Sequence, residues 1–284
     1  MPRLFSFASW NIEQFAGKPQ RFSRVVDFLN SVGPPDAADA NGNSPPDVFG
    51  IQEVKSSFTV FTEFTSRMPS HNFSITVAPD SPLNILVGVN RNLTAMFENR
   101  TELQAKVPTL RPGALISFPI GSENYSLLFL HLKAFDKPVG WGLRDDMIHH
   151  IRNLKKALDE NNQQDANFIA MGDINNVGLN VTFANNDMTE GEELSRYDTV
   201  FNARNMSLVP KDINETLWNG IGASDPPADA DHAFASDHLI IRPGANGTGL
   251  RVRGWPELAN DQLKTDWIND FSDHALIYGE VHDT

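Results

Sequence analysis

The chain has 284 residues, no cysteine, and 23 Lys and Arg against 36 Asp and Glu, which gives a formal net charge of −13 at pH 7. The absence of cysteine excludes disulfides, thiolate metal sites and a cysteine nucleophile. The acidic balance argues against binding nucleic acid or an anionic membrane through bulk charge alone. The length and the lack of any linker predict a single domain spanning residues 1–284.

The predicted elements alternate between strands and helices in chain order. An apolar strand is expected at 4–12, and a helix begins at Pro19 and continues to Val32 with apolar residues at a spacing of 3.6. A loop at 34–46, a strand at 48–54 and a helix at 56–68 follow. A further helix is expected at 141–160, and 174–230 is expected to be irregular. The remaining strands are expected at 73–77, 83–90, 93–98, 113–118, 125–132, 168–171, 239–241 and 275–281.

The N-terminal segment and the lack of long apolar runs indicate where in the cell the protein is expected. The first residues read as a strand rather than a signal peptide, and no run approaches the roughly 18 apolar residues that cross a bilayer. We therefore expect a cytoplasmic or otherwise soluble monomer with no membrane span. Secretion from a longer precursor stays open because there are eight Asn-x-Ser/Thr triplets. They begin at Asn72, Asn92, Asn99, Asn124, Asn180, Asn205, Asn214 and Asn246.

Polar side chains gather where the apolar strands end. Five segments share this pattern, namely SWNIE (9–13), GIQEV (50–54), FLHLK (129–133), MGDINN (171–176) and FSDHA (271–275), and ASDHLII (235–241) resembles the last. Strands hold their ends in place while leaving them open to solvent, so functional groups often collect there. The groups are Asn11, Glu13, Glu53, His131, Asp173, Asn175, Asp237, Asp273 and His274. Carboxylate and amide oxygens are hard ligands, which favours Mg²⁺, with Mn²⁺ or Ca²⁺ as alternatives.

These motifs, in this order and over residues 4 to 282, resemble the endonuclease/exonuclease/phosphatase superfamily. That superfamily includes pancreatic deoxyribonuclease, exonuclease III-type repair enzymes, bacterial sphingomyelinases and inositol-phosphate phosphatases. Its signatures stand here as Trp10-Asn11-Ile12, Gln52-Glu53-Val54, His131-Leu132, Gly172-Asp173-Ile174-Asn175 and Ser272-Asp273-His274. The resemblance implies an α/β fold of the α+β kind, a four-layer sandwich in which two packed mixed β-sheets are flanked by helices.

The resemblance also implies roles for these residues. Glu53 would anchor the metal, with Asn11, Asp273 and Glu13 nearby. Asp173 would orient or deprotonate the attacking water.

Two histidines and an aspartate would complete the catalytic set. His274 would contact the phosphate as a cation or act as the base, and Asp237 would orient its ring. His131 resembles the second histidine of the deoxyribonuclease-like branch, where it pairs with the equivalent of Glu53 and acts as an acid for the leaving group. Asn175 would donate to a non-bridging phosphate oxygen, and Arg111 would bind the phosphate, with a surface ion pair as its alternative.

Three functions are compatible with this site. The first is a metal-dependent nuclease on DNA or RNA, which the pair His131 and His274 favours. The second is a phosphatase or phosphodiesterase on a small phosphate ester such as a nucleotide, an inositol phosphate or a phospholipid head group. The third, a non-catalytic binding protein, is disfavoured because all the acid, amide and imidazole positions are present. Of these we prefer the nuclease.

Overall fold

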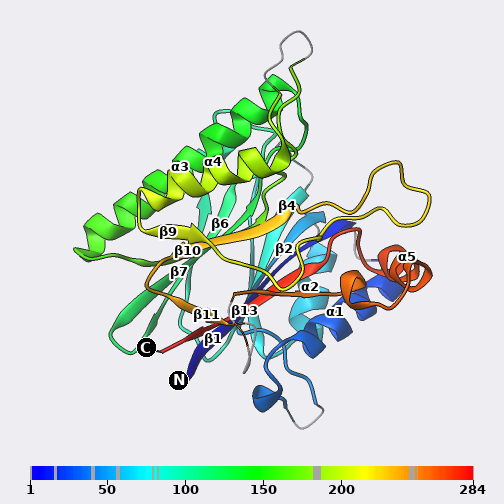
Figure 1. Ribbon diagram of the computed structural model, residues 1–284. Helices are drawn as coiled ribbons and strands as arrows, with labels where there is room; N and C mark the ends of the chain where they lie inside the picture. Colours follow the sequence, from blue (N-terminus) through cyan, green and yellow to red (C-terminus); the bar gives the residue numbers. More distant parts are fainter. Residues whose placement is uncertain are drawn as a thin grey trace.

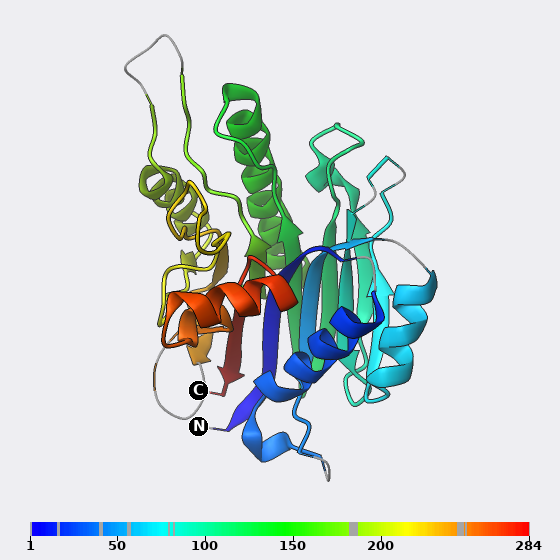
Figure 2. The same cartoon turned by 90° about the vertical axis from the view of Figure 1, so that its right-hand side faces the viewer.

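The computed structural model describes residues 2–283 except 16–17, 40–41, 56–57, 79, 82, 182–186, 243–246 and 248. In this part of the chain two mixed β-sheets pack face to face, and helices cover both outer faces (Figure 1). Turned by 90°, the structure shows the two chain ends close together at one end of the sheets (Figure 2). The predicted α/β sandwich is confirmed.

The first sheet contains both ends of the chain. Its strand order is β11-β13-β1-β2-β4-β3, with β12 paired to β13, and β1 runs parallel to β2 while the other pairs are antiparallel. The strands are β1 (Arg3–Phe15), β2 (Val48–Lys55), β3 (His71–Ile75), β4 (Leu83–Asn90), β11 (Ile240–Arg242), β12 (Arg251–Arg253) and β13 (Leu276–His282). Helices α1 (Pro19–Val32), α2 (Phe58–Arg67) and α5 (Asp261–Asp270) lie on its outer side (Figure 1).

The second sheet is built from the middle of the chain. Its order is β5-β6-β7-β8-β10-β9, and β7 and β8 form its parallel pair. The strands are β5 (Met96–Arg100), β6 (Gly113–Ile120), β7 (Glu123–His131), β8 (Asn167–Asp173), β9 (Met206–Leu208) and β10 (Asp231–Ser236). Helices α3 (Pro138–Asn162) and α4 (Glu190–Asn202) cover its outer face. Short 3₁₀ turns lie at Pro35–Ala37, Thr101–Gln104 and Trp255–Glu257.

The largest apolar core lies between the sheets, and alternate residues of each strand supply it. Phe5 and Phe7 of β1 belong to this core, whereas Ala8 and Trp10 face the layer of α1 and α2. Successive side chains of a strand point to opposite faces, so the strand is apolar on both sides. A third core lies between the second sheet and helices α3 and α4. The sheets approach closely at Gly50, where an added Cβ atom would lie only 2.2 Å from the ring of Phe129.

Several elements were not predicted from the sequence. The segment 174–230, expected to be irregular, contains α4 and β9, and α5, β12 and β10 also lie outside the predicted elements. The string ASDHLII is not one strand, because β10 ends at Ser236 and β11 begins at Ile240. Positions 56–57 of the predicted helix, 40–41 of the predicted loop and the triplet residue Asn246 lie outside the described residues. Among the described helices, none combines the length and the apolar character that crossing a membrane requires.

Candidate active site

Six polar side chains meet at one edge of the sandwich, and the two sheets supply three each. We call this group, namely Asn11, Glu53, His131, Asp173, Asp231 and His274, the strand-end cluster. Asn11 and Glu53 lie near the ends of β1 and β2, and His131 and Asp173 are the last residues of β7 and β8. Strands β10 and β13 run antiparallel to their neighbours β8 and β1, so both begin at this edge. Asp231 is the first residue of β10, and His274 lies two residues before β13.

The alternation of the strands explains why the polar groups of the second sheet turn inward. Phe129 of β7 and Met171 of β8 belong to the core between the sheets, and His131 and Asp173 follow two residues later on the same face. Asp231 stands in the same way two residues before the core residue Ala233. These three residues therefore continue the rows of side chains that form the core, which is why they are buried although they lie at strand ends.

A chain of hydrogen bonds holds the His274 ring. Its Nδ1 lies 2.8 Å from Oδ2 of Asp231, and its Nε2 lies 3.8 Å from Oδ2 of Asp173. The backbone is held as well, because Trp10 Nε1 donates to the carbonyl of His274 at 2.9 Å and His274 N donates to Ser272 Oγ at 3.1 Å. Two carboxylates therefore face the two ring nitrogens, and the orientation of the imidazole is determined by its neighbours.

Asp231 replaces Asp237 as the partner of His274. The sequence interpretation assigned this position to Asp237, and the structure contradicts it. Asp237 is exposed in the turn after β10, where its carboxylate accepts a hydrogen bond of 2.5 Å from Ser207 Oγ. The two aspartates flank opposite ends of β10, and only the beginning of that strand reaches the cluster.

Asp173 connects the two sheets. Its Oδ2 accepts a 2.9 Å hydrogen bond from Asn11 Nδ2, and its Oδ1 accepts a 3.1 Å bond from the backbone of Asn175. The strand reaches this point through Gly172, which has φ of 143° and whose added Cβ would lie 2.2 Å from the carbonyl of Leu130. Only glycine combines that backbone conformation with that space.

Glu53 and His131 lie on the other side of Asp173. His131 Nε2 is 3.5 Å from Oε1 of Glu53 and 3.4 Å from Oδ2 of Asp173. Glu53 Oε2 also accepts a 2.9 Å hydrogen bond from the backbone of Gln14. The pairing of His131 with Glu53 that the resemblance implied is present in the geometry.

Positive φ angles accumulate around the cluster. Glu13, Gln14, Glu53 and Asn175 have φ of 42°, 47°, 61° and 53°. Non-glycine residues rarely adopt this region, and those that do concentrate at functional sites. At Glu53 it coincides with an irregularity in the pairing of β2 with β4.

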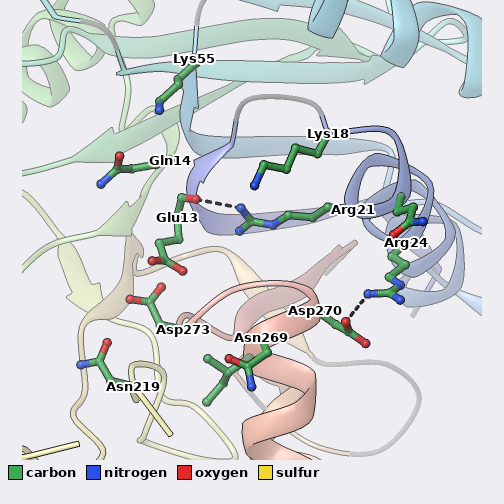
Figure 3. Close-up of a pocket in the computed structure, with 12 residues that line it drawn as sticks. Glu13, Gln14, Lys18, Arg21, Arg24, Lys55, Asn219, Asn269, Asp270 and Asp273 are labelled. Atoms are coloured by element: carbon green, nitrogen blue, oxygen red, sulfur yellow. Dashed lines mark hydrogen bonds and ion pairs between the residues drawn. The ribbon is translucent and has the colours of Figure 1, made fainter.

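The remaining predicted residues lie at the rim of the cluster. Glu13 donates its backbone N–H to Asn11 Oδ1 at 3.1 Å, and the Glu13 and Asp273 carboxylates point toward one another (Figure 3). Asn175 Nδ2 donates to the carbonyl of Leu132 at 3.2 Å. The buried Nε of Arg111 has no hydrogen-bond partner among the described residues, so the surface ion pair considered for Arg111 is not observed.

The electrostatics divide the cluster into groups with different charges. Burial alone lowers the pKa of His274, but the carboxylates of Asp231 and Asp173 outweigh it and raise this pKa to about 10. Burial, followed by the nearby Asp231 carboxylate, raises the pKa of Asp173 to about 7 against the opposing effect of His274. Burial and then the Arg111 cation lower the pKa of His131 well below its ordinary value. At neutral pH His274 is therefore a cation and His131 is neutral.

Two groups of ligands could hold a metal ion. Asp173, Asp231 and His274 offer ligand atoms that all lie within 4.8 Å of one another. A metal ion needs a free lone pair on the imidazole, however, and the raised pKa of His274 means that a proton competes for it. Glu53 and Asn11 offer oxygen atoms at the same edge, and hard oxygen ligands suit a divalent cation such as Mg²⁺. At the rim, burial and the Asp273 charge raise the pKa of Glu13, a repulsion that a bound cation would relieve.

The fold matches several solved structures. TDP2 from Caenorhabditis elegans in its truncated form superposes with a TM-score of 0.65 at 14% identity, covering 98% of both chains. D. rerio TDP2, complexed with a single strand DNA product, gives 0.62 at 14% identity over 98% of this chain and 99% of that one. A mannosyl-6-phosphatase from Bacteroides thetaiotaomicron gives 0.59 at 14% identity over 98% and 100%.

The chain has the fold of the endonuclease/exonuclease/phosphatase superfamily. The sequence matches no protein-family model and no curated protein. The resemblance seen in the motifs is confirmed at the level of this superfamily fold, which spans nearly the whole chain.

Two arginines that support the cluster were not recognised from the sequence. Arg21 of α1 donates to the carbonyls of Ile12, Glu13 and Phe271, which flank the site segments of the first sheet. Arg144 of α3 performs the equivalent task for the second sheet. Its N–H groups bind the carbonyls of Lys133, Phe135 and Gly178, and it forms a fully buried ion pair with Glu193.

Proposed function

We propose that the chain is a divalent-metal-dependent phosphoesterase that hydrolyses phosphodiester bonds, with DNA or RNA as the preferred substrate. The observation that carries this proposal is the strand-end cluster itself, in which a carboxylate, an imidazolium and an oxygen-rich ligand group converge at one buried edge. Phosphodiester hydrolysis needs a base for water, stabilisation of negative charge on phosphorus, and help for the leaving alkoxide. The cluster offers a group for each need.

Asp173 and His274 receive the proton-transfer and charge-stabilising roles. The pKa of Asp173, raised to about 7 by burial, is close to that of an efficient base at neutral pH. His274 stays protonated because its pKa is raised to about 10 against the effect of its burial, so it binds the phosphate as a cation. Of the two roles that the sequence left open for His274, the structure therefore favours the cation. Asp231 orients the ring through its bond to Nδ1.

The metal would be held by Glu53 and Asn11, with Asp273 and Glu13 at the rim, and Mg²⁺ suits this oxygen-rich set. When bound, it supplies positive charge to the phosphate oxygens and to the leaving alkoxide. His131 is neutral in the free protein because burial lowers its pKa, which disfavours the acid role taken from the resemblance. Its Nε2, which faces both Glu53 and Asp173, instead keeps these carboxylates in position.

Two residues would bind the phosphate oxygens. The unpartnered, buried Nε of Arg111 offers a charged donor, and Glu53 and Asp173 lie close enough to oppose the lowering of its pKa by burial. Asn175, held beside Asp173 by its backbone bond, offers an amide N–H.

A phosphatase on a small phosphate ester is the second candidate. The solved structures with this fold include both TDP2 and a mannosyl-6-phosphatase, so the fold does not choose between them.

The decisive experiment is a plasmid-nicking assay with Mg²⁺ or with EDTA, run beside a panel of small phosphate esters. We expect nicking with Mg²⁺ and none with EDTA. Glu53→Gln and His274→Ala should each lower kcat at least a hundredfold, since each removes a group that acts on the phosphate. The exposed control His149→Ala, on α3, should leave kcat unchanged.

Each outcome separates the candidates. Hydrolysis of small esters without nicking would favour the phosphatase. If no ester were hydrolysed with any divalent metal, the third function, a non-catalytic binding protein, would take precedence. Full activity of Glu53→Gln would show that the site is placed wrongly.

A further inference from the structure

A cavity of about 700 Å³ opens beside the strand-end cluster, between the beginning of α1 and the end of α5 (Figure 3). Glu13 and Asp273 line the side next to the cluster, since Glu13 lies two residues after Asn11 and Asp273 directly precedes His274. A cavity of this volume accommodates a group of nucleotide size. It is therefore large enough to receive part of a substrate whose reacting phosphate lies at the cluster.

Positive charge gathers on the opposite wall. The chain has 23 Lys and Arg against 36 Asp and Glu, yet Lys18, Arg21, Arg24 and Lys55 all line this one cavity. They come from α1, from the residue before it, and from the end of β2 (Figure 3). The cavity is therefore acidic beside the cluster and basic farther away.

Two of these four cations already have partners. Arg24 forms an ion pair with Asp270 of α5. The Arg21 guanidinium donates hydrogen bonds to the backbone carbonyls of Ile12, Glu13 and Phe271. It therefore contributes positive charge to the cavity wall, but each of its nitrogens already donates a hydrogen bond.

Lys18 and Lys55 are different. The side-chain amine of neither lysine forms a hydrogen bond or an ion pair with any residue that the structure describes, and both residues are exposed and line the cavity. Lysine amines elsewhere find carboxylates readily, as Lys155 does with Asp159 and Asp165. In one cavity, two ammonium groups without partners among the described residues can both form ion pairs with an anion that binds there.

The beginning of α1 adds to the positive electrostatic potential of the cavity. Lys18 is the residue before its first turn, and no side chain caps the helix there. The first amide N–H groups of a helix lack partners within the helix, and they carry a partial positive charge that favours anions. Gln20, in that first turn, also lines the cavity.

We propose that this cavity is an anion subsite that holds a second phosphate group of the substrate, while the strand-end cluster acts on the first. This inference rests on the proposed function and narrows it to substrates with more than one phosphate. The second phosphate comes either from the neighbouring position of an oligonucleotide or from another ester on a small molecule. Both offer the same chemistry to Lys18 and Lys55.

The test measures binding without turnover. A dinucleoside monophosphate is compared with the same compound carrying a terminal phosphate at either end, and a hexose monophosphate is compared with a hexose bisphosphate. Dissociation constants are measured by phosphorus NMR in EDTA, with Lys18→Ala/Lys55→Ala beside the wild type. Lys156→Ala is the matched control, because Lys156 is an exposed lysine on α3, which covers the other sheet.

We expect the extra phosphate to tighten binding by the wild type about tenfold, equivalent to about 1.4 kcal/mol. The double variant should lose this preference and the control should keep it. A preference within the nucleotide pair alone would identify an oligonucleotide source, and one within the hexose pair alone a small-molecule source.

The proposal is overturned if the wild type shows no preference in either pair, or if the preference survives in the double variant. Failure of the proposed function would appear separately, as absence of hydrolysis by the wild type with Mg²⁺. The binding measurement does not depend on that result.

Discussion

The ion pair between Arg144 and Glu193 should contribute more to stability than any exposed pair of the described chain. Both side chains are fully buried, and the guanidinium forms two bonds to the carboxylate, at 2.8 Å from Nε and 3.0 Å from a terminal nitrogen. An arginine has five N–H donors. The other three bind the carbonyls of Lys133, Phe135 and Gly178, so every donor is used.

Glu193→Gln removes the charge and leaves the Arg144 cation buried. Breaking a buried ion pair from one side costs about 3–5 kcal/mol. Domains have roughly 5–15 kcal/mol of stability, so this single change should remove a large fraction of it. The measurement is urea unfolding of the wild type and the variant, compared by the free energy of unfolding in water.

The chain contains its own control. Arg196 and Asp145 also join α4 to α3, at 2.8 Å, but the arginine side chain is 42% exposed. Exposed ion pairs are worth about 0.2–1 kcal/mol. We therefore expect Arg196→Met to lower the free energy of unfolding by no more than about 1 kcal/mol.

A double variant tests where the energy resides. Arg144→Met/Glu193→Leu removes both charges, yet it strips the carbonyls of Lys133, Phe135 and Gly178 of their donors. Each buried group left without a partner costs about 1–3 kcal/mol, so the double variant should remain less stable than the wild type although less so than the sum of the single variants. If Glu193→Gln lost less than about 1 kcal/mol, like the exposed control, the reasoning from burial would be refuted.

Three further predictions concern the cluster. Asp231→Asn should lower kcat at least a hundredfold because His274 loses its charged partner, whereas Asp237→Asn should leave kcat unchanged; both are measured by steady-state hydrolysis. Arg21→Lys, which cannot bind three carbonyls at once, should lower kcat about tenfold to a hundredfold with little change in KM. In a pH titration, kcat/KM should rise through about 7 as Asp173 ionises and fall through about 10 as His274 loses its proton.

Controls decide each of these. Equal losses from Asp231→Asn and Asp237→Asn would contradict the assignment of the His274 partner. Arg67→Met, which removes an arginine of an exposed ion pair on α2 that does not line the cavity, should leave kcat unchanged. In the pH experiment, His274 also affects stability. Its pKa is raised from 6.5 to about 10, so its stabilising contribution is complete below pH 6.5 and is lost as the pH rises through about 10. A kcat/KM that fell already near pH 7 would contradict a cationic role for His274.

The sequence predicted the position of the cluster well because each of its motifs lies within a short segment of the chain. An apolar run followed by a carboxylate, an amide or an imidazole is visible without the structure, and the structure brings together the residues at five such strand ends. The two sheets and most of their strands follow from the same runs.

The identity of the His274 partner depends on strand direction, which no local pattern gives. Asp231 and Asp237 are separated by β10, a rise of roughly 20 Å at about 3.3 Å for each residue. Only the antiparallel pairing of β10 with β8 decides that the beginning of β10 lies at the site. The repeated Ser-Asp-His string favoured the wrong end.

Helix α4 was missed for a related reason. Its buried residues are Glu193, Tyr197 and Phe201, and a buried glutamate breaks the apolar period by which amphipathic helices are recognised. One signal was available, because Thr189 and Glu192 form a capping box of the pattern Thr-x-x-Glu. The ion partner that makes burial of Glu193 possible lies 49 residues earlier in the chain, beyond the reach of any local pattern.

Arg21 and Arg144 together explain how a site divided between two sheets keeps its shape. Each arginine binds backbone carbonyls next to the site residues of its own sheet. Each half of the site is therefore fixed by hydrogen bonds from one outer helix. Among the described residues, the bonds of Asn11 to Asp173 and of His274 to Asp231, together with the core between the sheets, join the halves. Interiors are closely packed and shift little, so the spacing of the two halves is set by contacts such as that of Gly50 with Phe129. A methyl group at Gly50 would push the sheets apart directly below the cluster, and the 3.8 Å between His274 and Asp173 would widen although neither side chain had changed.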